Sequence, residues 1–256
     1  MCRTWAAALG VLAAALAAGV APARAEDKGV LNIYNWNDYI APQTIEMFER
    51  ETGIEVRYDV YDSNETLDAK LRAGHSGYDL VVPTASPFLA RQIPAGLYRP
   101  LDRSKLKNYG KLDPALMKQL ERYDPGNRHA VPWMWGTTGL GYNAAKIAEI
   151  MPNAPVNSLR LLLDPAVVAK FKDCGVEVLD SPTDVFPAVL AYLGRDPDSH
   201  NDEDLEAATK ALAAIRPFVR KWHSSSYINS LANGDVCLAF GFSGDIIQAA
   251  KRADEA

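Results

Sequence analysis

The sequence has few residues of the types that build metal centres. It contains four histidines and three cysteines in 256 residues, and the histidines are scattered without the spacing that metal ligands show. No P-loop occurs, and residues 136–141 read GTTGLG, which is not the dinucleotide-binding order and does not follow the first predicted strand. We therefore predict neither a metal site nor a cofactor.

Motifs of catalysis are also lacking. Residues 241–245 read GFSGD, where a nucleophile elbow would read G-x-S-x-G, so Asp245 stands in place of the closing glycine. A hydrolase on an α/β scaffold is the enzyme alternative, but no nucleophile and base stand at a recognisable spacing. We predict that the chain is not an enzyme.

The N-terminus has the pattern of an export signal. Arg3 precedes an uncharged run of alanine, leucine, valine and glycine, and Pro22 then leads into an A-x-A ending at Ala25. We predict a signal peptide over residues 1–25, cleaved after Ala25, with an uncleaved membrane anchor as the alternative. Cys2 precedes the apolar run, where no lipid-attachment cysteine belongs, and leaves with the leader.

Basic clusters are absent from the rest of the chain. The net charge is −5, and loss of Arg3 and Arg24 with the leader takes it to −7. This balance argues against binding to nucleic acid or anionic lipid and tolerates cationic ligands. Cys174 and Cys237 remain, and an even count in an exported protein predicts one disulfide, with two buried free thiols as the alternative.

Short β-rich runs alternate with amphipathic stretches, the pattern of a parallel sheet covered by helices. In the first half we expect strands and helices in alternation over Val30–Tyr34, Pro42–Glu51, Val56–Val60, Ser63–Gly74, Tyr78–Val82 and Pro87–Ala95. In the second half we expect Pro165–Lys172, Val176–Leu179, Thr183–Leu193, Asp202–Phe218, Val236–Phe240 and a helix from Ser243. Residues 100–127 carry no predicted element.

An aromatic, glycine-rich stretch over His129–Tyr142 marks the crossover between two α/β lobes, which we place at 26–137 and 138–256. Two such lobes enclose a cleft between them. Trp133 and Trp135 of this stretch either line the site or pack the hinge. The chain stops at Ala256 within the last predicted helix, and we interpret this ending as premature.

Three acidic residues stand where predicted strands end and helices begin: Asp38, Asp184 and Asp245. Positions at the carboxyl ends of parallel strands line ligand crevices. Two of the three have an aromatic residue close in sequence, Trp36 or Tyr39 beside Asp38 and Phe242 beside Asp245. Carboxylates and aromatic faces together suit an ammonium group, although each acid singly also reads as a helix cap.

Thr84 and Ser86 follow the third predicted strand and precede a helix. Their hydroxyl groups are candidates to accept a hydrogen bond from a ligand ammonium. A plain helix N-cap is the alternative role of Ser86.

At these residues the chain resembles the periplasmic polyamine-binding proteins, and most of all the putrescine receptors. The resemblance runs from about Leu31 to the last residue, in six blocks: NWNDYIAP at 35–42, YDVYDSNETL at 58–67, YDLVVPTAS at 78–86, GTTGLGYN at 136–143, CGVEVLDSPTDVF at 174–186 and HSSSYINSLANGDVCLAFGFSGD at 223–245.

The resemblance implies a two-lobe type II periplasmic binding protein fold with ligand positions at Trp36, Asn37, Asp38, Thr84, Ser86, Asp184, Phe242 and Asp245. Asn37 stands where the family commonly has Ser or Thr, and Asp184 where some putrescine receptors have Glu. Phe242 and Leu159 replace frequent family tryptophans. The smaller ring of Phe242 keeps an aromatic face with a weaker pull on a cation.

Members of this family continue well past Ala256, so the resemblance implies that the C-terminal return to the first lobe is missing. It also implies a periplasmic, monomeric receptor without nucleic-acid partners that captures a polyamine, putrescine first, by lobe closure. The receptor delivers the ligand to the membrane permease of an ABC transporter. The alternative is the same fold binding spermidine or another small cationic solute.

Overall fold

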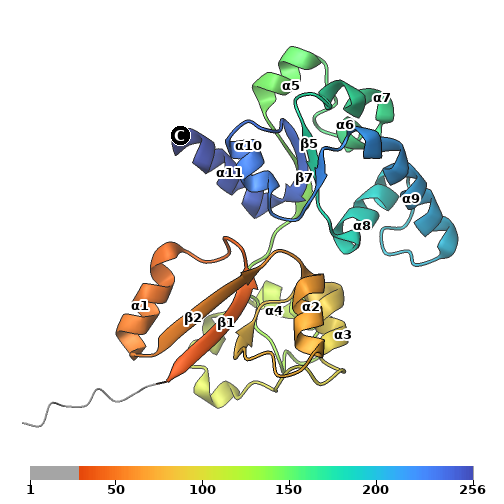
Figure 1. Ribbon diagram of the computed structural model, residues 1–256. Helices are drawn as coiled ribbons and strands as arrows, with labels where there is room; N and C mark the ends of the chain where they lie inside the picture. Colours follow the sequence, from red (N-terminus) through yellow and green to blue (C-terminus); the bar gives the residue numbers. More distant parts are fainter. Residues whose placement is uncertain (1–28, 256) are drawn as a thin grey trace, which may run out of the picture.

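The computed structural model describes residues 29–255 and contains two separate β-sheets (Figure 1). The predicted signal peptide, residues 1–25, lies outside the described residues. A three-stranded sheet belongs to residues 30–81 and a four-stranded sheet to residues 138–242. Figure 1 shows them as the centres of two lobes, joined by the segment that leads into the second sheet. The two-lobe α/β fold is confirmed, while the lobe boundary after residue 137 stays a prediction.

The first sheet is parallel throughout, in the order β2-β1-β3. Its elements are β1 (Val30–Trp36), α1 (Pro42–Thr52), β2 (Glu55–Tyr61), α2 (Asn64–Arg72) and β3 (Leu80–Val81). Gly53 ends α1 in the left-handed conformation, with φ 72°. The side chain of Ser63 caps α2 by accepting the Thr66 N–H at 3.2 Å. All five elements of this lobe follow the sequence prediction, although β3 is only two residues long.

Short helices follow the first sheet. They are η1 (Ala85–Leu89), α3 (Ala90–Gln92), η2 (Arg103–Lys105), η3 (Tyr109–Lys111) and α4 (Pro114–Leu120). The sequence prediction missed α4. Asp113 caps it by accepting the N–H groups of Ala115 and Leu116 at 2.7 and 3.1 Å, and Pro114 occupies its first turn. An Asp-Pro pair is a signal for the start of a helix. A helix of only seven residues is too short to show the apolar periodicity that would have supported this signal.

The second sheet has the order β4-β7-β5-β6 and is mixed. Its strands are β4 (Thr138–Tyr142), β5 (Val176–Val178), β6 (Lys221–Trp222) and β7 (Leu238–Phe242). The prediction of a parallel sheet is wrong here, because β4 runs antiparallel to β7. The glycines of β4 hid this strand, since Gly weakens a strand signal. Gly141 is needed there because the side chain of Ile246 lies where its Cβ would stand.

Helices cover both faces of the second sheet, with α10 and α11 on one side and α8 and α9 on the other (Figure 1). The helices of this lobe are α5 (Ala144–Ile150), α6 (Arg160–Leu163), α7 (Pro165–Val168), η4 (Ala169–Phe171), α8 (Pro182–Tyr192), α9 (Asp202–Ile215), η5 (Arg216–Phe218), α10 (Tyr227–Ala232) and α11 (Ser243–Glu255). Two of these helices follow parallel strands: α8 begins at Pro182, shortly after β5, and α11 begins at Ser243, directly after β7.

The two lobes differ in how much apolar surface they bury. The second lobe has a large buried cluster that includes Val168, Phe171 and Phe240. The buried cluster of the first lobe consists of Tyr34, Tyr61, Leu67 and Leu71. In the first sheet Val60 and Leu80 are 49% and 50% exposed. Burial of apolar surface is the main stabilising term in folding, so the second lobe is the more stabilised of the two.

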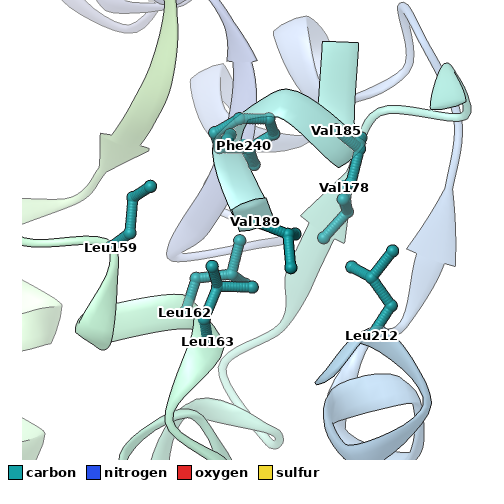
Figure 2. Close-up of a pocket in the computed structure, with 9 residues that line it drawn as sticks. Leu159, Leu162, Leu163, Val178, Val185, Val189, Leu212 and Phe240 are labelled. Atoms are coloured by element: carbon teal, nitrogen blue, oxygen red, sulfur yellow. The ribbon is translucent and has the colours of Figure 1, made fainter. Parts of the chain in front are cut away.

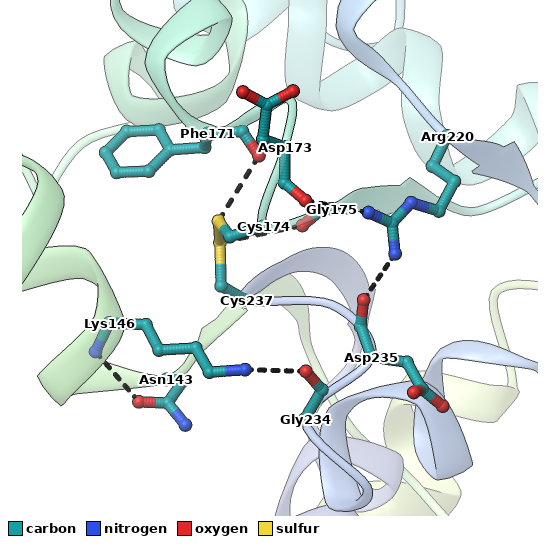
Figure 3. Close-up of a disulfide and its surroundings, with 10 residues drawn as sticks. All are labelled: Asn143, Lys146, Phe171, Asp173, Cys174, Gly175, Arg220, Gly234, Asp235 and Cys237. Carbon is teal, nitrogen blue, oxygen red and sulfur yellow. Dashed lines mark hydrogen bonds between the residues drawn. A yellow bond between two sulfur atoms is a disulfide. The ribbon is translucent and has the colours of Figure 1, made fainter.

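Cys174 and Cys237 form a disulfide with their Cα atoms 5.6 Å apart, as predicted (Figure 3). They precede β5 and β7, which pair in parallel from Val176 and Leu238, so the starts of the two strands lie side by side. The Arg220 guanidinium links the same two segments, because it donates to the carbonyl oxygen of Asp173 at 3.0 Å and to that of Asp235.

A small apolar cavity of about 10 Å³ lies inside the second lobe (Figure 2). It is lined by Leu159, Leu162, Leu163, Val178, Val185, Ala188, Val189, Leu212 and Phe240. This volume is at the lower limit for a single water molecule, and the lining offers no polar partner. The cavity is a packing void beside Leu159 and not a place for a cation.

Candidate ligand-binding site

The predicted acidic residues lie where the two lobes face each other. Asp38 follows β1 of the first sheet, Asp184 lies in the first turn of α8, and Asp245 lies in the first turn of α11. The negative charge of Asp38 is close enough to raise the pKa of Asp245. Tyr39 is within electrostatic range of both Asp245 and Asp184. Asp184 and Asp245 thus both act on Tyr39, and Asp38 acts on Asp245.

Asp245 is the most buried of the three acids, with 6% of its surface exposed. The Tyr227 hydroxyl donates to its Oδ2 at 2.5 Å and accepts the N–H of Phe242 at 3.0 Å. Burial raises the pKa of Asp245 to about 6, and the charge of Asp38 adds to this, while the Tyr227 hydrogen bond and Arg252 act in the opposite direction. Burial disfavours the ionised form of Asp245, and a cation placed beside the carboxylate would stabilise that form.

Asp184 is half-buried and accepts a 2.6 Å hydrogen bond from the Ser181 hydroxyl. Burial raises its pKa, and the Ser181 hydrogen bond opposes that rise. Burial, followed by the charges of Asp245 and Asp184, also raises the pKa of Tyr39. The Tyr39 ring therefore faces a negative potential contributed by both acids of the second lobe.

Aromatic rings from both lobes meet beside these acids. The centroids of Trp36 and Phe242 are 6.1 Å apart with an interplanar angle of 73°. Trp36 also lies 6.0 Å from Tyr39 and 4.9 Å from Tyr61. Its indole N–H donates to the carbonyl oxygen of Val82 at 2.9 Å, which fixes the orientation of the ring. Ring faces held in this way can attract a cation placed between the acids.

Asp38 is part of a polar link between the lobes. Its backbone is left-handed, with φ 59°, a conformation that aspartate tolerates better than most residues. Its Oδ1 forms an ion pair with Arg252 of α11 at 2.9 Å, and Arg252 also donates to Asn229 at 2.6 Å. The side chain of Asn37 donates to Asp38 Oδ2 at 3.3 Å. Asp38 therefore has a cationic partner within the protein itself.

The hydroxyl residues of the first lobe lie in a separate network. The Asn64 side chain donates to Thr84 Oγ1 at 2.9 Å and accepts the Thr84 N–H at 3.0 Å. Thr84 and Ser86 are exposed. In the part of the chain that the structure describes, no hydrogen bond joins either hydroxyl to the three carboxylates. Ser86 does not cap η1, whose preceding residue is Thr84 and which has no side-chain cap.

Trp133 fastens the crossover segment to the first lobe, since its indole N–H donates to the carbonyl oxygen of Tyr39 at 2.9 Å. This contact supports a packing role for Trp133. Both tryptophans of this segment are nevertheless exposed, Trp133 to 51% and Trp135 to 75%.

Sequence reasoning did not assign Tyr227 or Arg252 to the site. A signal for Arg252 was available, because Asp245 and Arg252 are two helical turns apart and so share one face of α11. Tyr227 gave no such signal, since its contact with Asp245 depends on how α10 packs on the sheet.

No cluster of three or more potential metal-ligating side chains occurs among residues 29–255. Within the same residues, no helix has the length and apolar character of a membrane span.

The chain matches the family of bacterial extracellular solute-binding proteins over residues 43–256. It is 56% identical over 248 residues to the putrescine-binding periplasmic protein SpuD of Pseudomonas aeruginosa. It is 52% identical over 249 residues to the putrescine-binding periplasmic protein PotF of Escherichia coli. Each match covers 96% of this chain and 67% of the relative, so the chain spans about two thirds of the length of these proteins.

Solved structures give the same result. A putative spermidine/putrescine ABC transporter protein from Listeria monocytogenes superposes with a TM-score of 0.77 at 31% identity, over 88% of this chain and 66% of that one. The substrate-binding protein PotD from Streptococcus pneumoniae gives 0.64 at 27% identity, with the same coverage. On these matches in sequence and fold, the chain belongs to the bacterial extracellular solute-binding proteins.

Proposed function

We propose that this chain is the ligand-capturing part of a periplasmic polyamine receptor, with putrescine as its first candidate ligand. The observation that carries the proposal is the electrostatic coupling of Asp184 and Asp245 to Tyr39 and of Asp38 to Asp245, together with the contact between the rings of Trp36 and Phe242 from opposite lobes. Putrescine is a linear diamine that carries a positive charge at each end. A site of acids and aromatic faces suits both charges and the apolar chain between them.

In this proposal Asp184 and Asp245 of the second lobe receive the ammonium groups. Both carboxyls have pKa values raised by burial, and an ammonium group beside each would stabilise the ionised form. Asp38 adds negative charge near Asp245 while it holds Arg252 across the lobes. Trp36 and Phe242 supply ring faces, and Asn37, Thr84 and Ser86 supply polar groups at the rim on the first lobe.

The ligand binds by closure of the lobes, without bond making, and the loaded receptor meets the permease of an ABC transporter in the periplasm. The relatives are named as putrescine-binding proteins, and two solved neighbours are named for spermidine and putrescine. Spermidine or another small cation is therefore the second candidate. An anionic solute would instead require an arginine or a helix N-terminus aimed at its carboxylate, and the one arginine at this site, Arg252, is paired with Asp38.

Titration calorimetry of the full chain with putrescine, spermidine, glutamate and arginine tests the proposal. We expect heat of binding with the polyamines and none with glutamate. Replacing Asp245 by alanine leaves a desolvated ammonium without its partner, so affinity should fall more than about tenfold. Exposed Asp198→Ala is a matched control that removes the same charge away from the site. Equal affinity of the Asp245→Ala variant and the parent would refute the site.

A further inference from the structure

A second buried acid lies in the middle of the second sheet, away from the three carboxylates of the proposed site. Glu177 belongs to β5, which is flanked on both sides by β7 and β6, and it is 3% exposed. Its carboxylate accepts hydrogen bonds from the hydroxyls of Ser226 at 2.9 Å and Ser230 at 2.8 Å. Burying a carboxylate costs free energy unless its oxygens accept hydrogen bonds, so the two serine hydrogen bonds offset the cost of burying Glu177.

The two serines lie at the start and in the middle of α10. They are four residues apart, which places them one above the other on the same face of the helix. Glu177 therefore fastens α10 to the central strand at two points.

Tyr227 follows the first of these serines and is fully buried. Its ring lies over β7 at the place where a side chain on Gly241 would stand. Its hydroxyl donates to Asp245 at 2.5 Å and accepts the Phe242 N–H at 3.0 Å. The position of α10 thus decides whether this hydroxyl reaches Asp245.

We propose that Glu177 is a positioning residue of the ligand site, which fixes α10 through Ser226 and Ser230 and so holds Tyr227 against the carboxylate of Asp245. The inference rests on the proposed function in one respect, namely that Asp245 receives the ligand. Glu177 itself does not touch the ligand. It acts through the first turn of α10 and the Tyr227 hydroxyl, and it affects the orientation and charge state of Asp245.

The test compares Glu177→Ala with Glu177→Gln in the full chain, by putrescine calorimetry and by NMR titration of the Asp245 carboxyl. The alanine variant loses both serine bonds, so α10 is no longer held and the Tyr227 hydroxyl no longer reaches Asp245. We expect putrescine affinity to fall about three- to tenfold, the effect of losing the one hydrogen bond from Tyr227 to Asp245. The pKa of Asp245 should rise above its value of about 6, because the Tyr227 hydrogen bond lowers it. The glutamine variant keeps an oxygen acceptor for one serine and can donate its amide N–H to the hydroxyl oxygen of the other, so it should restore both values to within about twofold.

A double-mutant cycle separates positioning from general stability. In a Tyr227→Phe background the hydroxyl is already gone, so Glu177→Ala should add no further loss of affinity. Val168→Ala is the control for stability, because Val168 is buried in the same core and lies on α7. It should lower the unfolding temperature and leave affinity and the Asp245 titration unchanged. Should Glu177→Ala fail to fold, the double variant Ser226→Ala and Ser230→Ala removes the same two bonds.

The positioning role is overturned if Glu177→Ala, or the double serine variant, leaves both affinity and the Asp245 titration unchanged. Equal losses with and without the Tyr227 hydroxyl also overturn it. If the parent chain binds neither putrescine nor spermidine, the proposed function fails. The NMR titration of Asp245 then still decides whether Glu177 controls that carboxyl, since it requires no ligand.

Discussion

Asp38 and Arg252 form an ion pair of 2.9 Å that joins the loop after β1 in one lobe to the far end of α11 in the other. The same helix carries Asp245 two turns earlier, and Arg252 lowers the pKa of that carboxyl. One arginine therefore both bridges the lobes and contributes to the electrostatics of the proposed site.

Replacing Arg252 by glutamine should weaken putrescine binding about two- to fivefold, since both partners are partly exposed and such pairs contribute about 1 kcal/mol or less. The variant loses an ion pair that joins the two lobes, so ligand held between them should dissociate faster. Stopped-flow dissociation and calorimetry would measure this. Lys251→Gln is the matched control, because it removes the same charge from an exposed neighbouring position. Equal effects of the two variants would show that only net charge matters.

Putrescine affinity should fall as the solution is acidified below about pH 6, the pKa of Asp245 in the ligand-free site. An ammonium group binds the ionised carboxylate, so each further unit of acidification should reduce affinity by up to about tenfold. The raised pKa of Asp184 adds in the same direction. Calorimetry near the pKa, in buffers of different ionisation enthalpy, should detect proton release on binding. Asp245→Asn should flatten this dependence, and affinity independent of pH around 6 would contradict the assignment.

The same carboxyl makes the stability of the ligand-free chain depend on pH. Its pKa is raised from 3.8 to about 6, so the folded chain holds a proton that the unfolded chain has lost. This contribution to stability is complete below about pH 4 and is lost as the pH rises through about 6. Urea unfolding should therefore show that the free energy of unfolding of the parent falls relative to that of Asp245→Asn between about pH 4 and pH 6.

The sequence predicted the position of the acids better than the way they are held. Asp184 and Asp245 follow from the rule that side chains after parallel strands meet at one edge of the sheet, and Asp38 follows a parallel strand of the other sheet. The rule concerns local order along the chain, so it could not find Tyr227. The reach of Tyr227 to Asp245 depends on Gly241 having no side chain, which is a property of packing between α10 and β7.

The same limit applies to the fold: elements with a local sequence signal were predicted, and a strand defined by long-range pairing was not. The strand-helix pattern of the first lobe predicted β1, β2, α1 and α2, because each has its own period, and Gly53 ends α1 while Ser63 caps α2. It did not predict β4, whose glycines hide the strand and whose partner β7 lies far along the chain. Antiparallel pairing of distant segments leaves no local trace in a glycine-rich run.

Gly241→Ala tests the packing of Tyr227 directly. The added methyl group would collide with the Tyr227 ring, so we expect the unfolding free energy to fall by about 1–3 kcal/mol, as overpacking does. Putrescine affinity should fall as well, because the hydroxyl is pushed away from Asp245. Gly139→Ala in the neighbouring β4 is the control, since a methyl group there would meet no atom within 4 Å. Unchanged affinity in Gly241→Ala would show that Tyr227 does not set the geometry of Asp245.

Loss of the Cys174–Cys237 disulfide should lower stability by about 4 kcal/mol in the chain-entropy account, since the bond closes a loop with a sequence separation of 63. Urea unfolding of the parent and of Cys174→Ser with Cys237→Ser measures the difference. Thiol titration of the denatured, unreduced parent provides the check on bonding. Two reactive thiols from these positions in that sample would contradict the bond.

Hydrogen exchange should divide the chain into two halves of unequal stability. Local opening is easiest where few apolar contacts are lost, and the first sheet has a buried cluster of four residues with Val60 and Leu80 exposed. We expect the amides of β5 and β7 to exchange slowest and those of β2 and β3 to exchange much faster in the ligand-free chain. Putrescine should slow exchange in both lobes, with a clear effect at the end of β1 near Trp36, because a ligand held by both lobes stabilises each against opening. Protection of the first sheet equal to that of β5 and β7 without ligand would show that burial within the lobe does not set its stability. A ligand effect confined to the second lobe would show that Asp184 and Asp245 bind the polyamine without the first.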